Sequence, residues 1–149
     1  QLDAREMLEI EHYDVIGAFD VIERINEDEM VLSNIYRALQ QWGVLLVTVP
    51  QHRWLWSAAD EYACHVRRYT RTELVRKVTR SGLTVEYMTS FVSLLVPVMW
   101  LNRLRASRAN YNPMDEFRIS SWLNKLLEII MFIELGLIKI GIKLKNNYF

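Results

Sequence analysis

The stretch from Tyr13 to Pro50 limits the possible folds of this chain more than any other feature. It reads YDVIGAFDVIERINEDEMVLSNIYRALQQWGVLLVTVP, with an apolar run at 15–19 inside an expected strand at 13–19, a helical pattern and a second apolar run at 44–49. Short apolar runs without alternation indicate strands that are covered on both faces, as in a parallel sheet. A helix between two such strands makes a βαβ unit, so we expect an α/β fold.

Local signals predict where the helix in this stretch begins and ends. Asn26 is suited to the N-cap position, and Glu29 three residues later completes a capping-box pattern. Gly43 follows the last apolar position of the pattern and is suited to the left-handed turn that ends many helices. Residues 2–5, upstream of the unit, have the composition of a strand end.

Two further elements are predicted after the second strand. Thr70 and Glu73 form the clearest capping-box pattern of the chain, so a helix is expected over 71–80. Ser81 and Gly82 end it, and the apolar residues at 83–88 predict a third strand. The order of strands and helices is typical of α/β proteins.

The carboxyl-terminal third has a different pattern. Residues 1–90 are expected to form the α/β part and residues 91–149 a helical cap or extension, with one long helical pattern over 119–144. Charged residues interrupt that pattern, which disfavours a membrane-spanning helix. Residues 91–144 either cover the substrate site as a cap or touch a membrane surface with their apolar stripe.

Composition narrows the classes of function. The 149 residues are 51% apolar, which suits one domain with a substantial core. The 18 basic and 18 acidic residues cancel, so nothing in the net charge predicts a nucleic-acid partner. The single cysteine, Cys64, excludes an internal disulfide framework and fits the reducing cytoplasm.

Three linked motifs resemble class I S-adenosylmethionine-dependent methyltransferases of the type 11/12 kind. The first is YDVIGAFDVIERI at 13–25, which is similar to the family's fourth-strand region. The second, at 37–50, resembles the R-A-L-K-P-G-G segment and the strand after it. The third, HVRRYT at 65–70, resembles the H-x-R-R-Y-T segment. The resemblance covers roughly residues 1–105 and implies a partial Rossmann-like sheet with S-adenosylmethionine as cofactor.

The resemblance also implies cofactor contacts. Asp3 matches the acidic residue after the family's third strand, which binds the adenine amino group. Ala18, Phe19 and Asp20, at the end of the expected first strand, would line the methionine side of the cofactor. A sulfonium ion favours nearby carboxylate and aromatic groups. Without the family context, Asp20 could equally serve a helix N-terminus and Phe19 could be a core residue.

The chain departs from the family pattern at three points. Arg24 stands where the family usually has histidine, which removes any acid–base role at that position because arginine stays protonated. Gln41-Trp42-Gly43 replaces Pro-Gly-Gly. The glycine-rich cofactor loop does not occur in these 149 residues. We therefore expect the carboxyl-terminal part of a longer methyltransferase, which alone would bind the cofactor weakly or not at all and would be inactive.

The segment 51–69 is the candidate for substrate recognition. His52 and His65 are the candidate catalytic bases, because imidazole titrates near neutral pH, although His65 could instead fix the segment by hydrogen bonding. Arg67, Arg68 and Tyr69 are candidate substrate-binding residues. The two arginines could instead pair with the acidic residues Asp60 and Glu61, and Tyr69 could be a packing residue. No metal site is predicted, because Cys64 and the histidines lack a further ligand at a typical spacing.

Three functions remain open from the sequence. The first is methyl transfer from S-adenosylmethionine to an unknown small-molecule, lipid or glycan acceptor. The second is a non-catalytic α/β interaction module that keeps the methyltransferase scaffold. The third is part of an NAD-dependent oxidoreductase, whose sheet can look similar over half a chain.

Overall fold

The computed structural model describes residues 5, 9–97, 100 and 121–146. By its internal contacts the chain divides into two compact units, Gln1–Glu86 and Tyr87–Phe149. The interpretation of the second unit as a cap over the substrate site stays a prediction.

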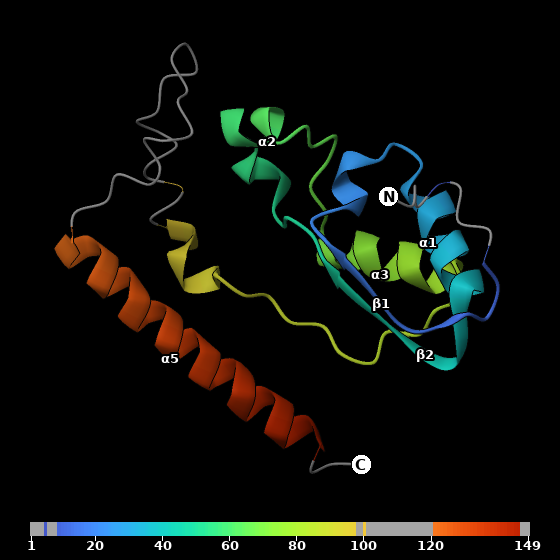
Figure 1. Ribbon diagram of the computed structural model, residues 1–149. Coiled ribbons are helices and arrows are strands. Elements are labelled where there is room, and N and C mark those ends of the chain that lie inside the picture. The colour runs from blue at the N-terminus through green and yellow to red at the C-terminus, as the bar shows by residue number, and fades with distance from the viewer. Residues whose placement is uncertain (1–4, 6–8, 98–99, 101–120, 147–149) are drawn as a thin grey trace. The chain divides into compact units, whose positions relative to one another are not determined.

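The first unit is built on a parallel pair of strands joined by a helix (Figure 1). Strand β1 spans Tyr13–Phe19, helix α1 spans Asp28–Ala38 and strand β2 spans Leu39–Thr48. A short 3-10 helix, η1 (Ile22–Arg24), lies between β1 and α1. The predicted βαβ unit is therefore confirmed, and the chain has the α/β architecture of a partial Rossmann-like sheet.

The two faces of this small sheet differ in burial. Val15, Val44 and Phe19 lie on one face and are 58%, 49% and 60% exposed, whereas Ala18 on the other face is 5% exposed. Helices α1 and α3 (Arg71–Arg80) contribute most of the remaining core side chains. The buried apolar residues of this unit are Ala18, Ile22, Val31, Leu32, Ile35, Ala38, Leu39, Leu55, Tyr69, Leu74 and Val78. The core thus lies on one side of the sheet.

Both predicted boundaries of α1 are wrong. The N-cap residue is Glu27 rather than Asn26, and no side chain caps the helix. At the other end the helix stops at Ala38 and passes directly into β2. Its last carbonyls accept hydrogen bonds from the backbone before β1, with Glu11 N to Arg37 O and His12 N to Ala38 O both 2.9 Å. Because the preceding chain caps the helix, no left-handed glycine turn is needed.

Gly43 lies inside β2 and has a different role from the one predicted. The strand pairs Tyr13 with Leu39 and Val15 with Val44, so residues 40–43 form an irregular bulge. Trp42 takes the positive φ of 71° in this bulge and is 90% exposed. A Cβ on Gly43 would lie 2.9 Å from the carbonyl oxygen of Gln40. The glycine is required by close backbone approach in a bulge.

Helix α3 begins as predicted, with the Thr70 side chain accepting a hydrogen bond from Glu73 N at 3.3 Å. The carboxylate of Glu73 does not return to the cap but pairs with Arg53 at 2.6 Å. The predicted strand at 83–88 is wrong, because these residues form no ladder with β1 or β2. A strand needs a neighbour for its backbone groups, and within the described residues the sheet has only two strands.

The second unit contains a short 3-10 helix and one long helix. Helix η3 spans Ser93–Leu95 and α5 spans Ser121–Asn146, which agrees with the helical pattern predicted over 119–144. Glu134 of α5 accepts hydrogen bonds from the backbone nitrogens of Ser93 at 2.7 Å and Leu94 at 3.3 Å. Among the residues described, no helix is both long and apolar enough to cross a bilayer. The strand end predicted at 2–5 lies almost entirely outside the described residues.

Candidate active-site edge

The carboxyl ends of β1 and β2 meet at one edge of the first unit. Asp20 follows β1 directly, and its backbone nitrogen donates to both the carbonyl oxygen and the Oγ1 of Thr48, each at 3.2 Å. Ala18 is buried just before this edge, whereas Phe19 is 60% exposed and Asp20 is exposed. Parallel α/β sheets bind ligands at this edge. Of the four predicted cofactor contacts, these three lie together, and Asp3 lies outside the described residues.

Three non-glycine residues in the segments that leave this edge have a strained backbone; Glu11, Trp42 and Val92, elsewhere in the described chain, also have a positive φ. Asp20 has φ 51°, His52 has φ 64° and Cys64 has φ 57°, all in the left-handed region that non-glycine residues rarely adopt. Such residues persist only where the surrounding structure holds them, and they cluster at functional sites. The segments after β1 and β2 are therefore held in defined, strained conformations.

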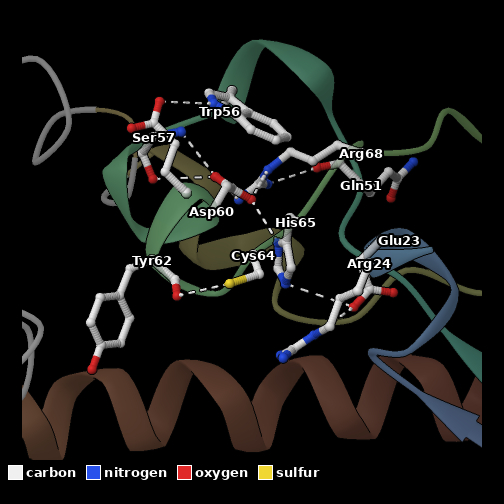
Figure 2. Close-up of polar contacts among 11 residues, drawn as sticks. Glu23, Arg24, Gln51, Trp56, Ser57, Asp60, Tyr62, Cys64, His65 and Arg68 are labelled. Atoms are coloured by element: carbon white, nitrogen blue, oxygen red, sulfur yellow. Dashed lines mark hydrogen bonds and ion pairs between the residues drawn. The ribbon is translucent and has the colours of Figure 1, made fainter. Parts of the chain in front are cut away.

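Segment 51–69 contains two short helices and is held by Asp60. Helices η2 (Arg53–Leu55) and α2 (Ala58–Tyr62) lie within it. The Asp60 carboxylate accepts hydrogen bonds from Arg68 Nε at 2.7 Å and Nη2 at 3.0 Å (Figure 2). It also accepts from Ser57 N at 2.9 Å, which completes a capping box at the start of α2. Arg68 Nη1 donates to Gln51 O at 3.0 Å, so the segment is tied back to the end of β2.

His65 links Asp60 to a second buried acid, Glu23. Its Nδ1 lies 3.1 Å from Asp60 Oδ1, and its Nε2 lies 3.7 Å from Glu23 Oε1 (Figure 2). Glu23 is fully buried, and neither of its carboxylate oxygens has a hydrogen-bond partner in the described part of the chain. Its backbone oxygen accepts from Val66 N at 2.9 Å. The array Asp60–His65–Glu23 thus connects segment 51–69 to the residues after β1.

The two acids of this array have opposite electrostatic environments. Burial raises the pKa of Glu23, because the carboxylate has lost water without gaining a hydrogen-bond donor. Burial also acts to raise the pKa of Asp60, but the hydrogen bonds from Arg68 and His65 outweigh it and lower that pKa. Asp60 is therefore a stable anion, whereas Glu23 holds a proton more readily than an exposed glutamate.

A third buried acid, Asp28, lies in the first turn of α1. Tyr69 Oη and Lys77 Nζ donate to its carboxylate at 2.6 and 2.7 Å, and Arg67 Nη1 lies 2.6 Å from Oδ2. Burial acts to raise its pKa, but the hydrogen bonds from Lys77 and Tyr69 lower it. Burial also raises the pKa of Tyr69, and the hydrogen bond to Asp28 adds to that effect. This cluster fixes α1, α3 and the end of segment 51–69 together.

The candidate substrate-binding residues are engaged inside the protein. Arg67 pairs with Asp28, and Arg68 pairs with Asp60 as the alternative reading of the sequence expected. Tyr69 is 1% exposed and packs in the core. His65 makes the structural contacts described above. The ring of His52, the other candidate base, lies beside that of Trp54 at a centroid distance of 5.4 Å, with the two ring planes tilted by 41°.

The sequence did not predict that Glu23 and Asp28 are buried. Nothing in the local pattern around either acid reports its burial. The capping box of Ser57 and Asp60 has a signal that could have been found, since serine precedes an acidic residue by three positions. No group of three or more potential metal ligands occurs among the described residues.

These features define a class of protein: an α/β domain with a parallel βαβ unit and a ligand-binding edge at the carboxyl ends of its strands. A family model described as "Methyltransferase domain" matches residues 3–87, which is more than half of the chain. The chain therefore belongs to the methyltransferase-domain family.

A solved structure is similar to part of this chain. It is a "putative methyltransferase" from Bacillus halodurans C-125, with 17% sequence identity and a TM-score of 0.47. The match covers 55% of this chain and 39% of that chain, so the present sequence spans well under half the length of that protein. Among curated proteins, none matches this chain.

Proposed function

We propose that this chain supplies one wall of an S-adenosylmethionine site and takes part in methyl transfer. The observation that carries the proposal is the edge formed by Phe19 and Asp20 in a chain of the methyltransferase family. The exposed aromatic ring and carboxylate there suit a sulfonium ion and an ammonium group, because both types of cation favour π faces and negative charge. Bound S-adenosylmethionine would supply the electrophilic methyl group.

The residues of this chain would hold and orient that cofactor. The two hydrogen bonds from Asp20 N to Thr48 fix the turn after β1, so the Asp20 carboxylate and the Phe19 ring start from a defined position. Holding donor and acceptor in line supplies much of the rate enhancement of a group transfer. Asp3 is proposed as the adenine ligand on the family resemblance.

His52 is the stronger candidate for a base that accepts the proton of the methyl acceptor. Both ring nitrogens of His65 face protein carboxylates, at 3.1 and 3.7 Å. Neither ring nitrogen of His52 has a hydrogen bond within the described part of the chain, and the residue lies four positions after Thr48, where β2 ends. The acceptor class is proposed to be a small molecule, a lipid or a glycan, since the chain carries no basic excess for nucleic acid.

The cofactor proposal is tested by calorimetric titration of the full-length protein with S-adenosylmethionine and, separately, with NADH. We expect heat only from the first. Phe19→Ala should weaken cofactor binding by about tenfold, in line with the loss of a cation–π contact. Val15→Ala is the matched control, because Val15 lies on the same strand and face and is equally exposed. Binding of NADH alone, or equal loss in both variants, would contradict the proposal.

The base is tested by transfer of a labelled methyl group to fractionated lipids, glycans and small molecules. His52→Gln should lower the transfer rate about a hundredfold, which is typical of losing a general base, and should leave the cofactor titration unchanged. His12→Gln, a change of the same kind at the start of β1, is the control. An unchanged rate in His52→Gln would remove His52 from this role.

A further inference from the structure

Helix α5 has two sides with different surroundings within the second unit. On one side Glu134 is 5% exposed and caps the backbone of η3, at 2.7 Å from Ser93 N. Ile138 and Gly141 continue this side and line a shallow groove with residues 87–94; Leu137, at the border with the next face, also lines this groove and remains 58% exposed. This side of α5 is therefore occupied by the chain itself.

Another side of α5 carries an exposed apolar stripe. Its members recur every three or four residues, so they lie on one face of the helix. They are between 45% and 71% exposed. The stripe consists of Trp122, Leu126, Ile129, Ile133, Leu137 and Ile140. Exposed large apolar side chains in a continuous row mark an interaction surface rather than ordinary scatter.

Positive charge lies beside this stripe. Lys125, Phe132 and Lys139 are spaced seven residues apart, so they form a second row along the helix, next to the stripe. The phenyl ring of Phe132 in this row is 67% exposed. Glu128 lies beyond the row, away from the stripe, and Glu134 is withdrawn against η3. The acids are thus kept away from the apolar face and the lysines are placed at its border.

We propose that this face of α5 docks on the surface of a bilayer that contains anionic lipids. A helix with an apolar face, bordering lysines and an exposed tryptophan lies in the plane of the interface, and its cations attract lipid headgroups. Phe91 and Leu94 of the segment packed on α5 are also 58% and 44% exposed, which adds apolar surface in the same unit.

A second copy of the chain fits this surface less well. A helical pair needs a narrow seam filled at every position, and Gly136 would leave a gap in the seam between Ile133 and Ile140. If two copies paired in parallel, Lys125 and Lys139 of one helix would also lie near the same lysines of the other helix, and these like charges would repel. A lipid surface imposes neither requirement. The proposal is independent of the cofactor and the methyl acceptor.

The test is co-sedimentation of the 149-residue chain with vesicles of phosphatidylglycerol and phosphatidylcholine in a three-to-seven mixture, and with vesicles of phosphatidylcholine alone. We expect binding to the anionic vesicles that weakens as salt is raised. Replacing both Lys125 and Lys139 by glutamine should weaken this binding by about fivefold for each lysine. Equal binding to both kinds of vesicle, with no dependence on salt, would overturn the proposed preference for anionic lipids.

The apolar stripe is tested with a matched pair of charge insertions. Ile133→Asp should reduce vesicle binding at least about tenfold, because it places a carboxylate in the apolar face. Asn124→Asp inserts the same charge on α5 outside the stripe and should bind almost as the wild type does. Circular dichroism of both variants checks that the helix is kept. Equal binding by the two variants overturns the proposal, as does a dimer that Ile133→Asp converts to a monomer.

Discussion

Two buried acids in the first unit, Asp28 and Glu23, differ in whether their carboxylates have hydrogen-bond partners. Asp28 accepts hydrogen bonds or ion pairs from Tyr69, Lys77 and Arg67 at 2.6 to 2.7 Å. Glu23 is at least as deeply buried, yet its carboxylate oxygens lack a hydrogen bond in the described residues. The side-chain nitrogens nearest to it, His65 Nε2 and Arg24 Nε, lie 3.7 and 3.8 Å from Oε1. A satisfied buried acid holds elements together, whereas an unsatisfied one is retained at a cost to stability.

This contrast separates structure from function within one unit. The Asp28 cluster joins α1, α3 and the end of segment 51–69 and leaves its carboxylate saturated. Glu23 lies just after the Phe19–Asp20 edge, where Asp20 has a strained backbone with φ 51°. Unsatisfied polar groups and strained backbone cost stability, and proteins retain them mainly at functional sites. The following substitutions test whether the two acids differ as described.

The largest effect is expected at Asp28. Asp28→Asn should lower the free energy of unfolding by about 3 to 5 kcal/mol, because it leaves the buried cations of Lys77 and Arg67 without their anion. Urea denaturation at neutral pH measures this loss. Glu29→Gln is the neighbouring control: Glu29 is 55% exposed and lies 3.7 Å from Lys77, so its loss should cost less than about 1 kcal/mol. Similar losses in both variants would contradict the cluster assignment.

The next effect is expected at Arg68. Arg68→Met keeps the aliphatic contacts but removes the paired hydrogen bonds to Asp60 and the bond to Gln51 O. We expect a loss of about 2 to 3 kcal/mol, the range for hydrogen bonds to a charged group that is left buried. Hydrogen exchange should show segment 51–69 opening ahead of the rest of the unit. A uniform loss of protection would argue against a local role.

The dependence of stability on pH should distinguish the two kinds of acid. The pKa values of Asp28 and Asp60 are lowered in the folded state, so their contribution is present above the unfolded value of 3.8 and is lost as the pH falls through the folded values. The pKa of Glu23 is raised, so its contribution is complete below 4.5 and is lost as the pH rises through the folded value.

Glu23→Gln isolates the second of these contributions. As the pH is raised above 4.5, the variant should become more stable than the wild type, because glutamine cannot ionise in the buried position. The loss of stability at acid pH should be the same in both proteins, because Asp28 and Asp60 are intact. Urea midpoints measured between pH 3 and pH 8 test this sign. A variant that is less stable than the wild type at pH 8 would show that Glu23 is fully paired as an anion.

The smallest effect is expected at Arg24. Its side chain is 49% exposed, and Nε lies 3.8 Å from Glu23 Oε1. Arg24→Gln should change the free energy of unfolding by less than about 1 kcal/mol, because exposed ion pairs contribute little. Thermal melts at low and high salt suffice for this comparison. A larger loss would mean that Arg24 neutralises the Glu23 carboxylate. Glu23 would then be a paired acid, as Asp28 is.

Much of the fold followed from the sequence, because its signals are local. The apolar run at 15–19, the cap at Thr70 and the long helical pattern are set by residues close together in the chain, and the structure places β1, α3 and α5 accordingly. The errors at α1 and at 83–88 arose where distant residues decide. Backbone from Glu11 and His12 ends α1, and a strand at 83–88 would need a partner strand.

The candidate site was predictable only in part. The edge with Ala18, Phe19 and Asp20 follows from strand order, and the pairing of Arg68 with Asp60 was one of two readings. The ion pair between Arg67 and Asp28 was not predicted, because the two residues are 39 positions apart in the sequence and only the tertiary fold brings them together. Burial of Glu23 likewise depends on packing by Val66 and His65, which no local pattern reports.

The direct passage from α1 into β2 has a consequence for motion. Ala38 ends the helix and Leu39 begins the strand, with no connecting loop to absorb a displacement. Connections between helices and strands usually contain several residues, and such loops are where elements move independently. Here helix and strand share one rigid joint, so opening of α1 should release β2 in the same cooperative event. The amide protons of both elements would then exchange with a common rate, from the Asp28 cluster to Thr48 at the active-site edge.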